Sequence, residues 1–136
     1  NKETGKVDVV DICAGSDAGQ ILDPATLEMQ CHGGIGSASL DTATFEEHIV
    51  DPATGRPLTY NMIDYKWRPF NEFPHFQTVL LESRFDTFQF KAVGVGEIAG
   101  AAAASATMQA ISNALGVQVA TYPATPDVIL KAIGKL

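Results

Sequence analysis

The chain has 136 residues, of which 46% are hydrophobic, so it is long enough to bury the core of one ordinary domain. Its formal net charge of −7 and its pI of about 4.7 argue against nucleic acid and anionic membrane surfaces as partners, because both bind clustered lysine and arginine. No apolar run reaches the roughly 18 residues of a transmembrane helix, and the polar start Asn1–Lys6 lacks the apolar segment of a signal peptide.

Cysteine and histidine are too sparse to predict a metal site. Cys13 and Cys31 fit no CxxC pattern, and we interpret them as two buried, reduced thiols of a cytoplasmic protein. The histidines are isolated from one another, at His32, His48 and His75. A zinc or iron site built from this chain alone is therefore not expected.

The first third of the chain predicts a strand, a turn and a long helix. Lys6–Ala14, rich in valine and isoleucine, predicts the strand, and the glycine-containing stretch Gly15–Gly19 predicts the turn. Pro24 opens a helical pattern with apolar residues near the 3.6-residue period, at Leu27, Cys31, Ile35 and Ala38. Three glycines interrupt this helix, and each costs about 1 kcal/mol relative to alanine. Another helix or a ligand is therefore expected to pack close to the backbone at Gly33, Gly34 and Gly36.

The middle of the chain predicts strands separated by turns. Phe45–Val50 is expected to form a strand, Asp51–Pro57 a turn, and Leu58–Tyr60 a returning strand. Asp64–Pro74, with the only tryptophan, is expected to be an ordered loop. Phe76–Ser83 is bulky at successive positions and therefore predicts a strand in the interior of a sheet.

The last third predicts two helices. A long helix is expected over Glu97–Leu115, with one apolar stripe formed by Ile98, Ala101, Ala104, Met108, Ile111 and Leu115. Gly116 is expected to cap it, a short strand to follow at Val117–Thr121, and a final helix to run from the N-cap Thr125 to about Ile133. These elements predict one domain over residues 1–136, of the α/β (α+β) class, with a mixed sheet, two long helices and a short C-terminal helix.

The stretch Gly94–Gly100 admits three interpretations. It is a simple turn that places Glu97 in the first turn of a helix, where the helix dipole favours a carboxylate. It is a dinucleotide-binding loop, although no acid follows the next predicted strand as that motif requires. Or it is a catalytic segment, in which two glycines let a planar ligand approach the backbone while Glu97 acts as a general base.

The catalytic interpretation agrees with a family resemblance. Phe90–Glu97, followed by a helix of small residues, resembles the glycine–glutamate segment of the xanthine dehydrogenase/aldehyde oxidase (molybdenum hydroxylase) family, in the C-terminal part of its molybdenum-binding large chain. Further segments resemble that family in the same order and cover nearly the whole chain, namely Thr4–Val7, Asp17–Pro24, Glu28–Ile35, Thr59–Lys66 and Gly116–Asp127.

The resemblance implies a site and a reaction. In that family a molybdenum–pyranopterin cofactor (molybdopterin, with or without the nucleotide of the dinucleotide form) hydroxylates an aldehyde or an N-heterocycle such as xanthine, with water as the oxygen source. Glu97 would be the catalytic base that accepts the proton of the transferred oxygen. Gln30 would contact the pterin, and Val95 and Gly96 would offer backbone contacts, whereas His32 would be structural. No residue of the chain is expected to ligate the metal directly.

The resemblance also implies partners. The family's large chain is several times longer, so this chain is expected to be a fragment or a split subunit that is inactive alone and works with the remaining molybdenum-binding chain. Iron–sulfur clusters and FAD are expected on other domains or subunits. Departures such as Ile98–Gly100, where the family frequently has proline, leave the base in place and the substrate class open. A non-catalytic structural or interaction domain derived from the family is the alternative.

Overall fold

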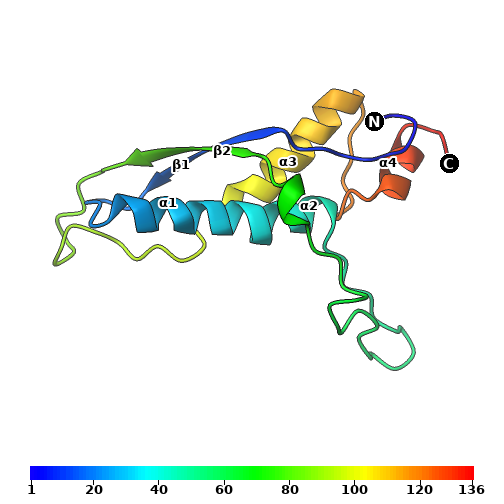
Figure 1. Cartoon of the computed structure of the whole chain (residues 1–136), viewed down its shortest axis with the longest axis horizontal. Helices are drawn as coiled ribbons and strands as arrows, with labels where there is room; N and C mark the ends of the chain where they lie inside the picture. The colour runs from blue at the N-terminus through cyan, green and yellow to red at the C-terminus, as the bar shows by residue number, and fades with distance from the viewer.

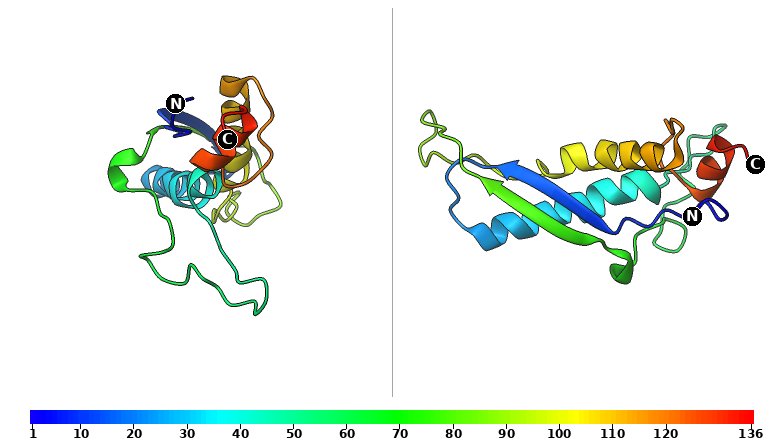
Figure 2. Two further views of the ribbon diagram at one scale, coloured as in Figure 1. Left: turned by 90° about the vertical axis from the view of Figure 1, so that its right-hand side faces the viewer. Right: turned by 90° about the horizontal axis from the view of Figure 1, so that it is seen from above.

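A computed structural model describes all 136 residues, apart from the side chain of Ser37. A two-stranded sheet and a long helical rod lie side by side, a second helix crosses the rod, and a short helix closes the end of the molecule where both termini lie (Figures 1 and 2). A long excursion, residues 45–69, projects away from this body and is called the arm below (Figure 1). The predicted α/β (α+β) class with two long helices and a short C-terminal helix is confirmed.

The sheet pairs two strands that are far apart in the chain. β1 (Asp11–Asp17) and β2 (His75–Leu81) run parallel, in register from Asp11 opposite His75 to Asp17 opposite Leu81. The first strand therefore begins later than predicted. The prediction of an interior strand is wrong for β2 within this chain, because its side chains alternate between exposed and half-buried positions. Cys13 lies on the exposed side of β1, so only Cys31 is the buried thiol that was predicted; both are free.

One continuous right-handed rod follows the turn after β1. It consists of α1 (Pro24–Gly33), a π-helical segment η1 (Gly34–Leu40) and α2 (Asp41–Thr44), with helical backbone angles at every junction. The Asp23 carboxylate caps α1 by accepting hydrogen bonds from the backbone N–H groups of Ala25 and Thr26, at 3.1 and 3.3 Å. The rod confirms the predicted helix and extends it to Thr44.

The glycines of the rod allow close packing, as predicted. A Cβ atom placed on Gly100 would lie 2.9 Å from the carbonyl oxygen of Gly34, so the second helix crosses the rod with the two backbones almost in contact. Ser39 closes the crossing, because its hydroxyl donates to the Gly100 carbonyl at 2.5 Å. The ring of Phe73 occupies the space that a side chain would need at Gly36. At Gly33, by contrast, a Cβ atom would meet nothing within 4 Å.

Two glycines, one at the crossing and one in an open part of the rod, therefore predict opposite effects on stability. Gly100→Ala is expected to destabilise the fold by about 1–3 kcal/mol, because the added methyl group forces the two backbones apart. Gly33→Ala, the matched control, is expected to be neutral or to stabilise by about 0.5–1 kcal/mol, because the site is open and helical. Thermal and urea unfolding of both variants test this, and a Gly100→Ala variant as stable as Gly33→Ala would contradict the crossing.

The second long helix begins later than the sequence indicates. α3 (Gly100–Leu115) starts three residues after Glu97, and Gly116 caps it in the left-handed conformation, φ 77°, as predicted. Met108, Ile111 and Leu115 pack inward as the predicted stripe requires, but Ala101 and Ile98 are exposed. Residues 117–121 form no strand, which corrects that prediction, and α4 (Pro126–Ala132) follows with Thr125 as its N-cap, as predicted.

Two apolar clusters fill the body. The first joins the sheet, the rod and the start of α3, and Cys31, Ile35 and Leu40 are its most buried members. The second joins α3 and α4 around Met108 and Ile129. Two residues fix the glycine-rich segment before α3 to the body, because Ala99 is a buried member of the first cluster and Val95 packs against it.

The arm is an irregular hairpin rather than a pair of strands. The predicted strands at residues 45–50 and 58–60 are wrong, because only one isolated bridge, Val50 to Pro57, joins the two sides. The predicted turn between them is confirmed by a hydrogen bond from the Asp51 N–H to the Arg56 carbonyl, at 2.9 Å. The expected loop at residues 64–74 is also present, with the short 3-10 helix η2 (Phe70–Glu72) inside it. Apolar side chains of the arm face solvent, and Ile63 is 88% exposed.

A tyrosine–glutamate contact at the base of the arm predicts a titration at high pH. The Tyr65 hydroxyl donates a hydrogen bond to the Glu46 carboxylate, which raises the pKa of Tyr65 from 10.0 to about 12. Because the folded chain holds this proton more tightly, the contact stabilises the fold below about pH 10 and is lost as the pH rises toward 12. We expect tyrosinate absorbance to show a step near pH 12 that Tyr65→Phe removes and Tyr122→Phe retains; a native titration without that step would contradict the contact.

Candidate functional site

The site begins at the turn that links β1 to α1. Gly19 adopts a left-handed conformation, φ 68°, and a Cβ atom there would lie 2.3 Å from the carbonyl oxygen of Lys91. That close approach lets the Gln20 N–H donate to the Lys91 carbonyl at 2.8 Å, while the Val93 N–H donates to the Ala18 carbonyl at 3.0 Å. The turn and the strand-like segment 91–93 are thereby joined by an antiparallel bridge, Gly19 to Ala92.

Asp17 fixes the start of this turn. Its carboxylate accepts hydrogen bonds from the Gly19 N–H and the Ser83 N–H, each at 3.0 Å, and from the Ser83 hydroxyl. The Ser83 hydroxyl and the two backbone donors lower the pKa of Asp17 below its ordinary value. Sequence reasoning missed Ser83, because the hydrogen bonds between Ser83 and Asp17 span 66 positions and depend on the long-range pairing of β1 with β2. The turn itself has a local signal in the sequence, because an aspartate two residues before a glycine, here Asp17 and Gly19, is typical of a turn.

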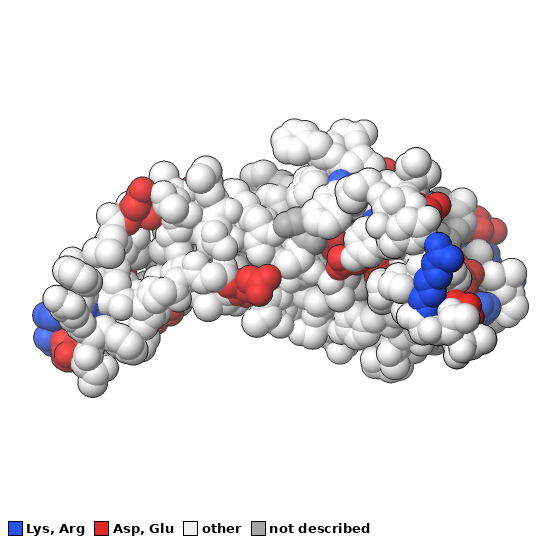
Figure 3. Space-filling view, turned by 90° about the horizontal axis from the view of Figure 1, so that it is seen from below, with Lys and Arg blue, Asp and Glu red and all other residues white. Residues whose placement is uncertain are grey.

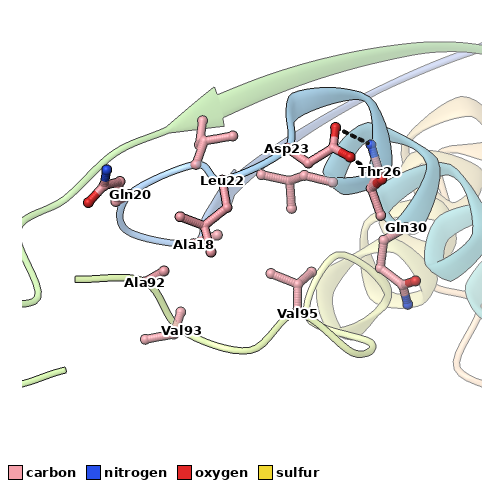
Figure 4. A pocket seen from close by; sticks show the side chains of 11 residues that line it. Ala18, Gln20, Leu22, Asp23, Thr26, Gln30, Ala92, Val93 and Val95 are labelled. Carbon is pink, nitrogen blue, oxygen red and sulfur yellow. Dashed lines mark hydrogen bonds between the residues drawn. The ribbon is translucent and has the colours of Figure 1, made fainter. Parts of the chain in front are cut away.

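A pocket of about 230 Å³ lies between this turn, the first turns of α1 and the glycine-rich segment (Figure 4). Its walls are mainly apolar, with polar side chains at Gln20, Asp23, Thr26 and Gln30. Asp23 and Thr26 are bound to each other, since the Thr26 hydroxyl donates to the Asp23 carboxylate at 2.7 Å. Gln30 and Val95 stand together at the end of the pocket nearest α1 (Figure 4).

Three of the four predicted site residues meet here. The Gln30 side-chain amide donates a hydrogen bond to the carbonyl oxygen of Gly96, 66 residues later in the chain. Val95 lines the pocket and packs on the first apolar cluster. Gly96 is exposed, and a Cβ atom on it would meet nothing within 4 Å, so the backbone is open to approach at this point. The structure therefore joins Gln30 and the Val95–Gly96 backbone at one edge of one pocket.

Glu97 follows this edge directly. It is exposed and lies in a bend ahead of α3, and its carbonyl accepts a hydrogen bond from the Gly100 N–H at 3.0 Å. The expectation that Glu97 occupies the first helical turn is wrong, so the argument that the helix dipole favours its charge no longer holds. Its carboxylate makes no hydrogen bond or ion pair with any side chain that the structure describes, and is therefore available to a ligand.

The dinucleotide-loop interpretation loses its structural basis. That motif needs a strand running directly into the glycine turn and a helix directly after it. Residues 93–95 form no strand, two residues (Ile98 and Ala99) separate Glu97 from α3, and residues 117–121 are not the predicted second strand.

His32 is held by its neighbours, as the structural interpretation requires. Its ring stacks on Phe76 with the centroids 4.9 Å apart, and its Nε2 lies 3.1 Å from the Thr78 hydroxyl. Over the described residues, no three His, Cys, Asp or Glu side chains are grouped so that they could hold a metal ion. None of the described helices is long and apolar enough to cross a membrane. On the face shown in Figure 3, lysine and arginine are few and lie toward the ends of the molecule.

Comparison with known proteins defines the class. Residues 1–74, more than half of the chain, match the molybdopterin cofactor-binding domain family. The chain therefore belongs to that family, as the resemblance predicted. It is 32% identical over 121 residues to a xanthine dehydrogenase molybdenum-binding subunit of Escherichia coli, which covers 89% of this chain and 16% of that protein. It is 31% identical over 128 residues to the aldehyde oxidoreductase molybdenum-binding subunit of Escherichia coli, which covers 93% and 17%.

Solved structures agree with this assignment. Quinoline 2-oxidoreductase from Pseudomonas putida matches with a TM-score of 0.82 and 29% identity, over 93% of this chain and 16% of that one. An aldehyde oxidoreductase from Desulfovibrio desulfuricans matches with a TM-score of 0.83 and 27% identity, over 96% and 14%. The chain thus spans about a sixth of the length of the curated relatives that it matches.

Proposed function

We propose that this chain forms part of the molybdenum-binding subunit of a hydroxylase, as a fragment or a split subunit, and that the assembled enzyme oxidises an aldehyde or a xanthine-like N-heterocycle with oxygen from water. The observation that carries the proposal is the meeting of Gln30, Val95 and Gly96 at one pocket edge, with the unpartnered carboxylate of Glu97 beside it. Relatives named for xanthine, aldehyde and quinoline oxidation support this range of substrates.

The residues present fit a pterin cofactor. A planar heterocycle with amide-like edges needs an apolar slot with a few polar groups at its rim. The pocket offers that combination, and Gln30 provides an amide that both donates and accepts. Gly96 leaves its backbone open where a side chain would otherwise block a ligand. The lack of any metal-ligating cluster in the described residues is compatible with a metal held by its cofactor rather than by this chain.

Each residue has a separate role in this proposal. The bound molybdenum–pterin group supplies the oxidising power and the site of oxygen transfer. Glu97 is the general base: its exposed carboxylate accepts the proton that the transferred oxygen gives up. Gln30 contacts the cofactor, and the Val95–Gly96 backbone lies against it. The turn at Asp17–Gln20 holds the opposite wall of the pocket in place.

Further parts of the assembly belong to the same proposal. Residues 1–136 act as one domain in the C-terminal region of the molybdenum-binding chain, and the cofactor is molybdopterin or its dinucleotide form. The remaining molybdenum-binding segments, iron–sulfur clusters and FAD are supplied by other domains or subunits, so the isolated chain is inactive. The proposal also places the protein in the cytoplasm, a reducing compartment, because Cys13 is exposed and unpaired.

The test is turnover of the assembled enzyme with Glu97→Gln, normalised to bound molybdenum. Loss of turnover with the cofactor retained supports the proposal, and normal turnover would refute the general-base role. A complex that binds no molybdenum in its native form would favour a non-catalytic domain instead.

A further inference from the structure

The peptide group between Gly96 and Glu97 is held from one side only. Its carbonyl oxygen accepts the hydrogen bond from the Gln30 side-chain amide. Its N–H group, which belongs to Glu97, donates to none of the described residues. The peptide is trans, so it is planar with its N–H pointing away from its carbonyl. A bond that fixes the carbonyl therefore also fixes the direction of the Glu97 N–H and the position of the Glu97 Cα atom.

Little else determines the orientation of this peptide. Gly94 and Gly96 are both exposed, and a Cβ atom on either would meet nothing within 4 Å, so packing does not restrict them. Val95 fixes the segment on one side through the apolar cluster, and the Gly100 N–H holds the Glu97 carbonyl on the other. Glycine permits many backbone conformations, so the peptide between these two points would rotate without a further contact. Gln30 supplies that contact.

The Gln30 amide also retains bonding capacity toward the pocket. A glutamine side chain carries two N–H donors and one carbonyl acceptor. One donor is used at Gly96, which leaves one donor and the acceptor on a side chain that lines the pocket. A ligand that bonds to these remaining groups would hold the amide in the orientation that also holds the Gly96 carbonyl.

We propose that Gln30 is a positioning residue for Glu97: it orients the Gly96–Glu97 peptide, and it links that orientation to occupancy of the pocket by the cofactor. This rests on the proposed function, in which Glu97 is the general base, and it adds a role for Gln30 beyond cofactor contact. Misplacement of a catalytic group by about 1 Å can cost about 100-fold in rate, so one hydrogen bond at this peptide has a measurable effect on turnover.

The test uses the assembled enzyme with three substitutions at one position. Gln30→Met keeps the length and removes the donor, Gln30→Glu replaces the donor with an acceptor, and Gln30→Lys restores a donor. Molybdenum and pterin content, kcat per bound molybdenum, KM and a crystal structure are measured for each. Gln109→Met is the matched control, because Gln109 is an exposed helical glutamine whose amide donates to Asn113 at 3.0 Å, away from the pocket.

We expect Gln30→Met and Gln30→Glu to lower kcat per molybdenum by about 10- to 100-fold with KM little changed. Gln30→Lys should recover part of that loss, and the crystal structure of Gln30→Met should show a rotated Gly96–Glu97 peptide. The inference is overturned if activity falls only in proportion to cofactor content, if lysine is no better than methionine, or if the peptide does not rotate. If Glu97→Gln retains full turnover, the proposed function fails. If Glu97→Gln loses turnover while Gln30→Met turns over normally, only the positioning role of Gln30 is excluded.

Discussion

Glu97→Gln is expected to lower kcat per bound molybdenum by about 10²- to 10⁴-fold, the usual contribution of a general base. Glutamine keeps the size and shape of the side chain but cannot accept the proton. Because the Glu97 side chain is exposed and its carboxylate makes no hydrogen bond or ion pair with any described side chain, its removal should leave the fold and the cofactor content unchanged. KM should change little, since the lost interaction acts during the chemical step rather than in substrate binding.

A glutamate outside the site provides the control for this experiment. Glu47 is exposed at the start of the arm, away from the pocket, and Glu47→Gln removes the same charge. It should leave kcat, KM and molybdenum content unchanged. Equal turnover in Glu97→Gln and Glu47→Gln would exclude Glu97 as the base, and equal loss in both would point to net charge rather than to a specific proton acceptor.

The helices could be predicted largely because their signals are local. Pro24 opens the rod with the Asp23 cap before it, and Gly116 ends α3 in the left-handed conformation that glycine favours. The sequence predicts that α3 starts at Glu97, because a glycine turn followed by alanines fits a helix that begins three residues earlier equally well. The helix starts at Gly100, where the backbone can pass Gly34, a contact 66 residues distant that no local pattern reveals.

The strands and the site needed long-range information. Residues 45–50 have the composition of a strand, but strand formation depends on a partner, and the arm offers only a single bridge. The site residues Gln30, Val95, Gly96 and Glu97 were named from the family resemblance. Their proximity follows from the parallel pairing of β1 with β2 and from the bridge between Gly19 and Ala92, neither of which sequence spacing indicates.

The base of the arm contains an interaction that no sequence pattern suggested. Asp41 and Arg68 form an ion pair at 3.0 Å in which the side chains are 0% and 1% exposed. The guanidinium also donates to the Thr44 hydroxyl at 2.7 Å and to the Glu72 carbonyl at 3.3 Å, and it lies 4.8 Å from the centre of the Phe45 ring. Burial raises the pKa of Asp41, against the opposing effect of the Arg68 N–H groups and charge.

Removal of one partner of this pair should have the largest effect on stability. Arg68→Met leaves the Asp41 carboxylate buried without a counter-charge and is expected to cost about 3–5 kcal/mol in the free energy of unfolding. Asp41→Leu combined with Arg68→Met removes both charges, and it should recover most of that loss, because a well-packed apolar pair replaces a buried ion pair at little cost. Thermal unfolding and proteolysis of the arm measure both effects.

An exposed ion pair on α4 provides the control that distinguishes the effect of burial on stability from the effect of losing a charge. Lys131 and Asp127 lie 2.9 Å apart with side chains that are 63% and 55% exposed, and Lys131→Met should cost less than about 1 kcal/mol. If Arg68→Met costs no more than Lys131→Met, the Asp41–Arg68 pair does not anchor the arm. If the double substitution is as unstable as Arg68→Met alone, the hydrogen bonds from Arg68 to Thr44 and Glu72, rather than its charge, hold the arm to the rod.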